Sequence, residues 1–131
     1  MDAAPQQIEN KQLKGGKIMP APIHEPNKHI TTAGVRTGKT DPRHWDTLSN
    51  GRGISIDVDL KPENLDISKP LVVVTSLVGE NNHWATTGGS SVYNLTHEGF
   101  TVYVRWIDGG LLNSEFAKDR GWYINWIAMQ Y

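Results

Sequence analysis

The chain has no cysteine, which excludes disulfides, thiolate metal sites and catalysis by a cysteine nucleophile. It also lacks any apolar run close to the roughly 20 residues of a transmembrane helix, so we expect no insertion into a membrane. No charged segment followed by an apolar one marks a signal peptide. These absences leave the compartment open, and the chain fits equally as a piece of a longer exported protein.

An excess of positive charge is missing as well. The 13 Lys and Arg residues are balanced by 14 Asp and Glu residues, which gives a formal net charge of -1. No run of Lys or Arg lies on a periodic element, as it would in a protein that binds nucleic acid or an acidic membrane. We therefore expect no nucleic-acid partner.

The histidines do not form a metal-binding motif. They are scattered, no two have a ligand spacing, and no His-Glu-x-x-His helix is present. The five are His24, His29, His44, His83 and His97. We interpret them as loop and interface histidines, and we expect no metal and no cofactor.

Catalytic motifs are equally scarce. Residues 34–40, GVRTGKT, resemble a phosphate-binding loop but are one residue short, and Asp41 and Pro42 prevent a following helix. Asp57 and Asp59 lie two apart on one predicted strand, whereas glycosidases draw their carboxylates from different elements. No serine lies in a nucleophile elbow. The chain is therefore not expected to be an enzyme.

The sequence divides into an N-terminal tail and one domain. Residues 1–29 hold most of the prolines and show no periodicity of 2.0 or 3.6 residues, which is typical of a flexible linker. The alternative is an arm that becomes ordered on a partner subunit. Residues 30–131 have the length and patterning of a single β-rich domain.

Short strands separated by turns predict an all-β, six-stranded antiparallel β-sandwich. Residues 53–60 alternate apolar and polar side chains, as a half-buried strand does. Residues 71–78 form a continuous β-branched run, which predicts a strand covered on both faces. Further strands are expected at 31–36, 91–95, 100–107 and the C-terminus, and one helical turn at 114–120 with Ser114 as its cap.

The last strand predicts a homo-trimer. Trp122, Ile124 and Trp126 alternate with Tyr123, Asn125, Ile127 and Met129, so both faces carry bulk. The strand at 100–107 similarly places Tyr103, Arg105 and Ile107 opposite its apolar face. One small sandwich cannot bury both faces of the same strands, so we expect the second face to meet copies of itself.

Two aromatic residues in predicted loops suggest a sugar-binding site. His44-Trp45 and His83-Trp84 each place a tryptophan where burial does not require one. Asparagines, threonines, serines and a glycine pair surround Trp84, and sugars are held by such a mixture of an aromatic face and polar groups. The alternative is that Trp84 closes an edge of the sandwich or an oligomer interface.

Three segments together resemble the H-type lectin domain over about residues 34–131. They are KPLVVVTSL at 69–77, EGFTVYVRW at 98–106 and YINWIA at 123–128, preceded by a similar TGK at 37–39 and HW at 44–45. The resemblance implies a six-stranded antiparallel sandwich, a tight trimer and sugar binding in clefts between protomers. The family's sugar-contacting loop corresponds to residues 49–52 without its acid, and its Trp-His pair corresponds to Trp106 and Ile107. The family's arginine is absent near Thr86.

We therefore expect a carbohydrate-binding or adhesion module whose partners are glycans and further copies of the chain. The alternative is a trimerising structural cap or fibre-tip domain with no sugar ligand. The predicted ligand-binding residues are Trp84, His83, Asn82, Arg52, Ser49, Asp108 and Trp106. An extracellular or cell-surface location follows from this function, with the cytosol as the alternative.

Overall fold

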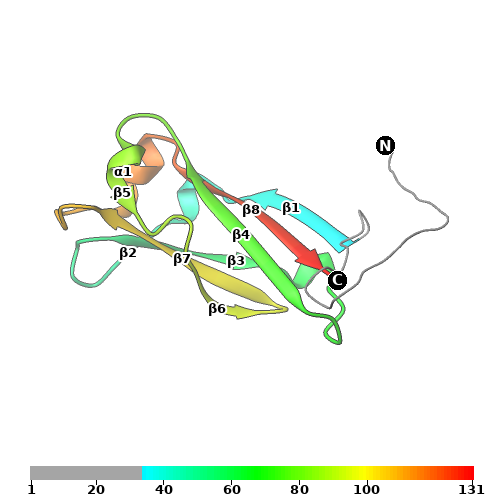
Figure 1. Cartoon of the computed structure of the whole chain (residues 1–131). Coiled ribbons are helices and arrows are strands. Elements are labelled where there is room, and N and C mark those ends of the chain that lie inside the picture. Colours follow the sequence, from blue (N-terminus) through cyan, green and yellow to red (C-terminus); the bar gives the residue numbers. More distant parts are fainter. Residues whose placement is uncertain (1–33) are drawn as a thin grey trace, which may run out of the picture.

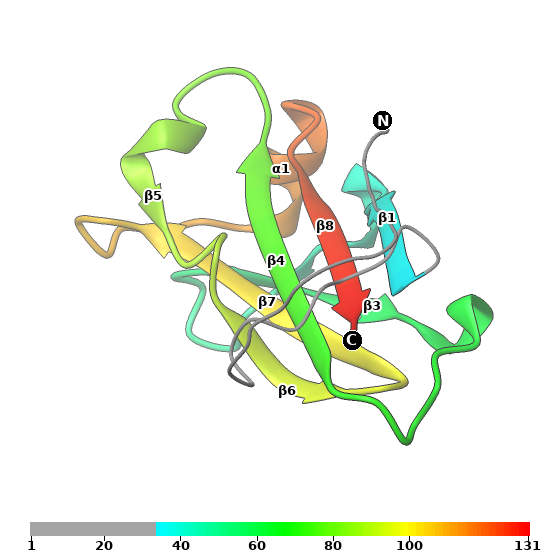
Figure 2. The same cartoon turned by 45° about the vertical axis from the view of Figure 1, so that its right-hand side comes forward.

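The computed structural model describes residues 34–131, which form two antiparallel sheets with little helix. The sheets face each other as two layers, and the short helix α1 covers one end (Figures 1 and 2). The strands are β1 (Val35–Lys39), β2 (Asp46–Thr47), β3 (Ile54–Asp59), β4 (Leu71–Val78), β5 (Thr86–Thr87), β6 (Val92–Thr96), β7 (Gly99–Trp106) and β8 (Tyr123–Gln130). The helix α1 spans Ser114–Asp119, and the 3-10 turns η3, η4 and η5 span Pro42–His44, Lys61–Glu63 and His83–Ala85.

The first sheet has three strands in the order β1-β8-β4. The C-terminal strand β8 lies in its centre, where Ile127 pairs with Thr37 of β1 and with Val74 of β4. The second sheet has the order β2-β3-β7-β5, and β6 also pairs with β7. The chain therefore holds its C-terminal strand between two neighbours, which explains why an aromatic-rich terminus is ordered.

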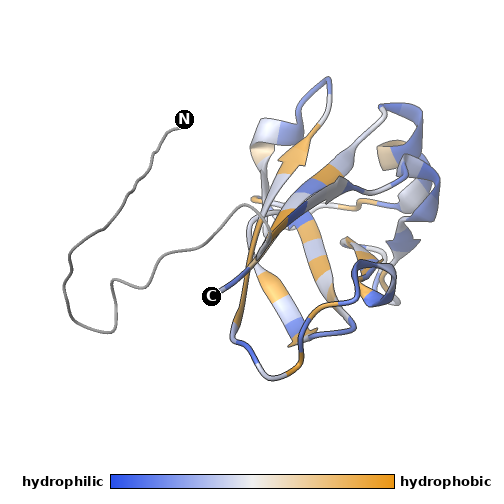
Figure 3. Ribbon diagram, turned by 90° about the vertical axis from the view of Figure 1, so that its right-hand side faces the viewer, coloured by the Kyte–Doolittle hydropathy of each residue, from blue (hydrophilic) through white to orange (hydrophobic). Residues whose placement is uncertain are grey.

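Alternating side chains build the core between the two layers. Along β3 the residues Ile54, Ile56 and Val58 are buried while Asp57 and Asp59 are exposed, as the sequence pattern predicts. Phe100, Val102 and Val104 of β7 and Ile124, Trp126 and Ala128 of β8 complete the central part of the core. Figure 3 shows this alternation of hydrophobic and hydrophilic residues along the strands.

Aromatic rings close the core under α1. Trp122 is fully buried and makes edge-to-face contacts with Trp106 and Phe116, with ring centroids 5.6 Å apart in each pair. Its Nε1 donates to the carbonyl of Glu80 at 3.1 Å. Since each buried indole N–H requires a partner, this bond fixes the ring in one orientation.

Glycine in the TGK segment has a packing role. A Cβ on Gly38 would lie 2.3 Å from Cζ2 of Trp126, so only glycine leaves room for that indole. Residues 35–39 form strand β1, and thus the similarity of residues 34–40 to a phosphate loop has no structural counterpart.

Several sequence predictions need correction. Two of the eight strands, β2 and β5, are only two residues long and were not expected. The first strand was expected at 31–36 but β1 begins at Val35, and residues 31–33 lie outside the described part. The run at 71–78 forms β4 as predicted, yet β4 is an edge strand whose outer side chains Val72 and Val74 are exposed. The β-branched run therefore does not indicate cover on both faces within one chain.

The N-cap of α1 is Asn113 and not Ser114. The Asn113 side chain accepts a hydrogen bond from the backbone N–H of Phe116 at 2.9 Å. The predictions for the tail at 1–29 fall on residues outside the described part of the chain. Within residues 34–131 no helix is both long and apolar enough to cross a membrane.

Candidate functional site

Three of the predicted binding segments meet at one end of the sandwich. Nη1 of Arg52 donates to the carbonyl of Gly109 at 3.1 Å, and the N–H of Ile107 donates to the carbonyl of Ala85 at 3.0 Å. The turn after β7 therefore contacts both the β2–β3 hairpin and the segment that carries His83 and Trp84. These segments lie at the left end of the molecule in Figure 1.

Trp84 is the most exposed aromatic residue of this end, with 76% of its surface accessible. It lies on η5, which follows Asn81 and Asn82, both in the left-handed conformation. Because the ring is exposed, Trp84 does not close an edge of this chain's own sandwich. The neighbouring His83 is half-buried, and its Nδ1 is buried without a hydrogen-bond partner within residues 34–131.

The other predicted polar residues are held by local hydrogen bonds. The carboxylate of Asp108 accepts from the N–H of Gly110 at 2.8 Å, which stabilises the turn after β7. Ser49 and Arg52 belong to the hairpin loop between β2 and β3, which is closed by a bond from the N–H of Gly51 to the carbonyl of Leu48. All three predicted residues are exposed.

Two tryptophans that the sequence associated with binding are packing residues. Trp45 is buried, and its Nε1 donates to the carbonyl of Trp122 at 2.9 Å, so it does not present a ring to a ligand. Trp106 is half-buried between Phe116 and Trp122, and its Nε1 donates to the carbonyl of Leu111 at 3.0 Å. The structure assigns both rings to the core and its border.

A hollow of about 270 Å³ lies beside these segments, on the outer face of the second sheet. Tyr93 of β6 and Tyr103 of β7 meet edge-to-face there, with centroids 5.1 Å apart, and both are exposed. Arg105 lies two residues along the same face of β7 and is also exposed. The remaining lining residues are Leu48, Thr87, Gly88, Ser91 and Val104.

Glycine allows one wall of this hollow to approach the sheet. Gly88 has a φ of +104°, and a Cβ there would lie 2.2 Å from the carbonyl oxygen of Tyr103. The next residue, Gly89, packs on Leu77, and its carbonyl accepts from Oγ1 of Thr75 at 2.9 Å. The loop is thus fixed between the two sheets, and it holds Ser91 beside the tyrosines.

Tyr93, Tyr103 and Arg105 are not among the ligand-binding residues predicted from the sequence. The outward-facing bulk of Tyr103 and Arg105 predicts an interface between copies, because the strand pattern does not show the hollow that these side chains line. Tyr103 and Arg105 alternate with buried Val102 and Val104, which places them on the outer face of β7. Tyrosine and arginine are enriched at protein interfaces as well as in sugar sites, so it is the hollow of about 270 Å³ on this face that favours a ligand.

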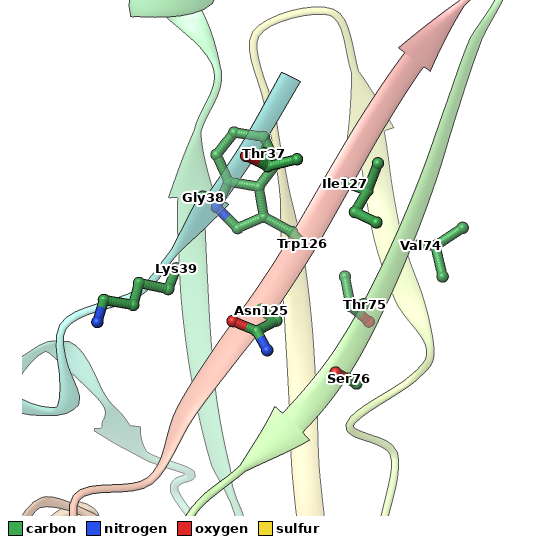
Figure 4. A pocket seen from close by; sticks show the side chains of 9 residues that line it. All are labelled: Thr37, Gly38, Lys39, Val74, Thr75, Ser76, Asn125, Trp126 and Ile127. Carbon is green, nitrogen blue, oxygen red and sulfur yellow. The ribbon is translucent and has the colours of Figure 1, made fainter. Parts of the chain in front are cut away.

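A second hollow, of about 480 Å³, lies on the outer face of the first sheet. Figure 4 shows Thr37 and Lys39 from β1, Asn125 and Ile127 from β8, and Val74 and Ser76 from β4 around it. Its apolar side continues into Val35, Met129 and Val72, which share one row across the three strands. Val74 is 53% exposed and Ile127 is 41% exposed, so this face is apolar and uncovered in the single chain.

A third hollow lies around the opposite end of β3 and is acidic. Asp57, Asp59 and Glu98 line it, and the carboxylate of Asp57 accepts from Oγ1 of Thr101 at 2.7 Å. It has no exposed aromatic face, because Phe100 is buried in the core. Among residues 34–131 no group of three or more His, Asp or Glu side chains could hold a metal ion.

Comparison with known proteins gives no relatives: no family model, no curated protein and no solved structure matches this chain.

Proposed function

We propose that this chain is a carbohydrate-binding module of the H-type-lectin kind, which acts as a multivalent homo-trimer on glycans. The observation that supports sugar binding best is the hollow beside the tyrosine pair. Tyr93 and Tyr103 offer apolar ring surface, while Arg105, Ser91 and Thr87 offer hydrogen-bonding groups within the same 270 Å³. Trp84 is exposed on the segment that leads into Thr87, and we propose that it contacts a longer saccharide.

The chemistry of a pyranose suits this arrangement. One side of the ring carries C–H groups that pack on an aromatic face, and the rim carries hydroxyls that exchange hydrogen bonds with polar side chains. Each good polar contact adds about 1 kcal/mol, and a single site of millimolar affinity corresponds to about 4 kcal/mol. Several copies acting together are therefore needed for useful binding.

The outer face of the first sheet is the surface that we propose for the trimer. It presents Val72, Val74 and Ile127 to solvent on strands that are otherwise well packed. Burying one side chain of this size contributes about 1.5–3 kcal/mol, so a patch of several residues favours association. The tyrosine hollow lies on the other sheet, and the same assembly leaves it open to ligand.

Binding is tested with a glycan array probed by the purified full chain. We expect Tyr103→Ala to abolish the signal of the wild-type chain and Trp84→Ala to weaken it for longer saccharides. Tyr131→Ala is the matched control, because it removes an exposed tyrosine outside the hollow and leaves binding unchanged. A stable oligomer that binds no glycan would contradict the proposal.

That negative result would favour the second candidate, a trimerising structural cap or fibre-tip domain with no ligand. The observation in its favour is the same apolar face of β1, β4 and β8, which requires a partner whether or not a sugar binds. The glycan array separates the two functions, since only the first requires glycan binding, whereas sedimentation tests the oligomer that both functions require.

A further inference from the structure

Two arginines approach one another at the turn after β7. Nη1 of Arg52 donates to the carbonyl of Gly109 at 3.1 Å, and Nη1 of Arg105 lies 4.0 Å from the position of a Cβ on the same glycine. Arg52 comes from the β2–β3 hairpin and Arg105 from the outer face of β7. Two positive charges from separate elements therefore reach Gly109, and one of them, Arg105, also lines the tyrosine hollow.

Neither guanidinium is neutralised by the chain around it. Within residues 34–131 no carboxylate oxygen lies within 4.0 Å of a nitrogen of Arg52 or Arg105. Asp108 is the acid nearest to Arg105 in sequence, and its carboxylate accepts from the N–H of Gly110. The side chain of Arg105 makes no hydrogen bond to any described residue. Its planar set of donors is thus free for a ligand in the hollow.

We propose that the hollow takes an acidic saccharide, whose carboxylate or sulfate group lies between Arg105 and Arg52 while its ring packs on Tyr93 and Tyr103. This inference rests on the proposed function and adds the charge class of its ligand. Arginine binds a carboxylate or sulfate through two parallel N–H donors, and such charge-assisted bonds are about twice as strong as neutral ones. A neutral sugar leaves both positive charges without a counter-ion.

The test compares matched pairs of glycans on the purified full chain. The pairs are sialyllactose with lactose, a glucuronic-acid disaccharide with its glucose analogue, and a sulfated disaccharide with its desulfated form. We expect the wild-type chain to bind the acidic member about tenfold more tightly. The pair that shows the largest ratio distinguishes a carboxylate from a sulfate.

Arginine variants decide whether this preference arises at the turn after β7. Arg105→Ala is expected to lose about tenfold for the acidic member and less than about twofold for the neutral one. Arg105→Lys should recover only part, because it restores the charge without the planar pair of donors. Lys61→Ala is the control, since it removes a positive charge beyond the opposite end of β3 and should change neither value.

Each other outcome contradicts the inference. Equal binding of both members, unaffected by Arg105→Ala but lost in Tyr103→Ala, would overturn the acidic ligand and leave the carbohydrate-binding function standing. Acidic binding that persists in Tyr103→Ala and disappears at about 0.15 M salt would be attraction to any polyanion and would also overturn it. Failure to bind any saccharide would contradict both proposals.

Discussion

Two of the five tryptophans differ completely in environment, and they provide a test of the packing at the scale of single residues. Trp122 is fully buried against Trp106 and Phe116, whereas Trp84 is 76% exposed. We expect Trp122→Ala to lower the free energy of unfolding by about 3–5 kcal/mol and Trp84→Ala to change it by less than about 0.5 kcal/mol. Urea denaturation followed by circular dichroism measures both values.

A milder variant keeps this test informative if Trp122→Ala does not fold. Trp122→Phe retains a ring in the cluster and loses the hydrogen bond to Glu80, so a smaller loss of about 1–2 kcal/mol is expected. Equal stabilities for Trp122→Phe and the wild type would show that the ring is not held as described.

Asp41 makes the stability of the fold depend on pH in the acidic range. Its carboxylate accepts from the side chain and from the backbone N–H of Arg43, and these bonds hold the pKa of Asp41 well below its usual range. The folded chain therefore keeps the carboxylate charged at pH values where the unfolded chain, with an ordinary pKa of about 3.9, has become protonated. The stabilisation is complete above that value and decreases as the pH falls toward the folded-state pKa.

The expected result is a difference in unfolding free energy between the wild type and Asp41→Asn that is largest above about pH 4 and shrinks below it. Urea denaturation between about pH 2 and pH 6 measures this difference. Asp119→Asn is the control, because Asp119 forms no ion pair within residues 34–131. A difference that stays constant throughout the range would refute the linkage.

At the scale of elements, α1 covers one end of the sandwich and is capped by Asn113. Asn113→Ala removes the acceptor for the N–H of Phe116 and should cost about 1 kcal/mol of stability. Asn113→Asp keeps an acceptor at that position and should be nearly neutral. Thermal unfolding of the two variants compares them, and similar losses in both would mean that the cap is not the cause.

The strands differ in how well their patterns predict them. The alternation in β3 gives both the element and its buried face, because one side meets the core and the other meets water. The run in β4 predicts a strand but not its position at the edge of a sheet, since β-branched residues suit central and edge strands alike. The two-residue strands β2 and β5 carry no periodic signal of their own.

The proposed binding site is predictable only in part, because its contacts join distant segments. Trp84 and Arg52 stand out in the sequence as an aromatic and a basic residue in polar loops. The contact from Arg52 to Gly109 spans 57 residues, and no local pattern encodes it. Trp45 shows the opposite case, because the sequence suggests a loop tryptophan available to a ligand. In the structure its ring lies in the core, and its Nε1 donates to the carbonyl of Trp122.

At the scale of the whole molecule, the two proposed roles lie on different outer faces, association on the first sheet and sugar binding on the second. Mutations can therefore test the two roles separately. Ile127→Lys places a charge on the apolar face of β8 and should dissociate the oligomer while the monomer stays folded, because Ile127 is already 41% exposed. Sedimentation velocity at micromolar concentration and circular dichroism measure the two properties. Tyr103→Ala, on the other sheet, should leave the oligomer intact. A wild-type chain that sediments as a monomer would end the trimer proposal.

The position of β4 at the edge of its sheet also bears on aggregation. β4 carries no charge, proline or glycine and pairs only with β8 among the described strands, so its other edge would template the addition of further strands if it were uncovered. The loop around Gly89 lies against that edge and has almost no spare room, because a Cβ on Gly89 would be 2.7 Å from Cβ of Leu77. A bulky substitution such as Gly89→Val should lift the loop and uncover the edge. We expect fibril formation from chains that are still largely folded, which would mean that this small loop prevents strand addition at the edge of β4 in the native fold.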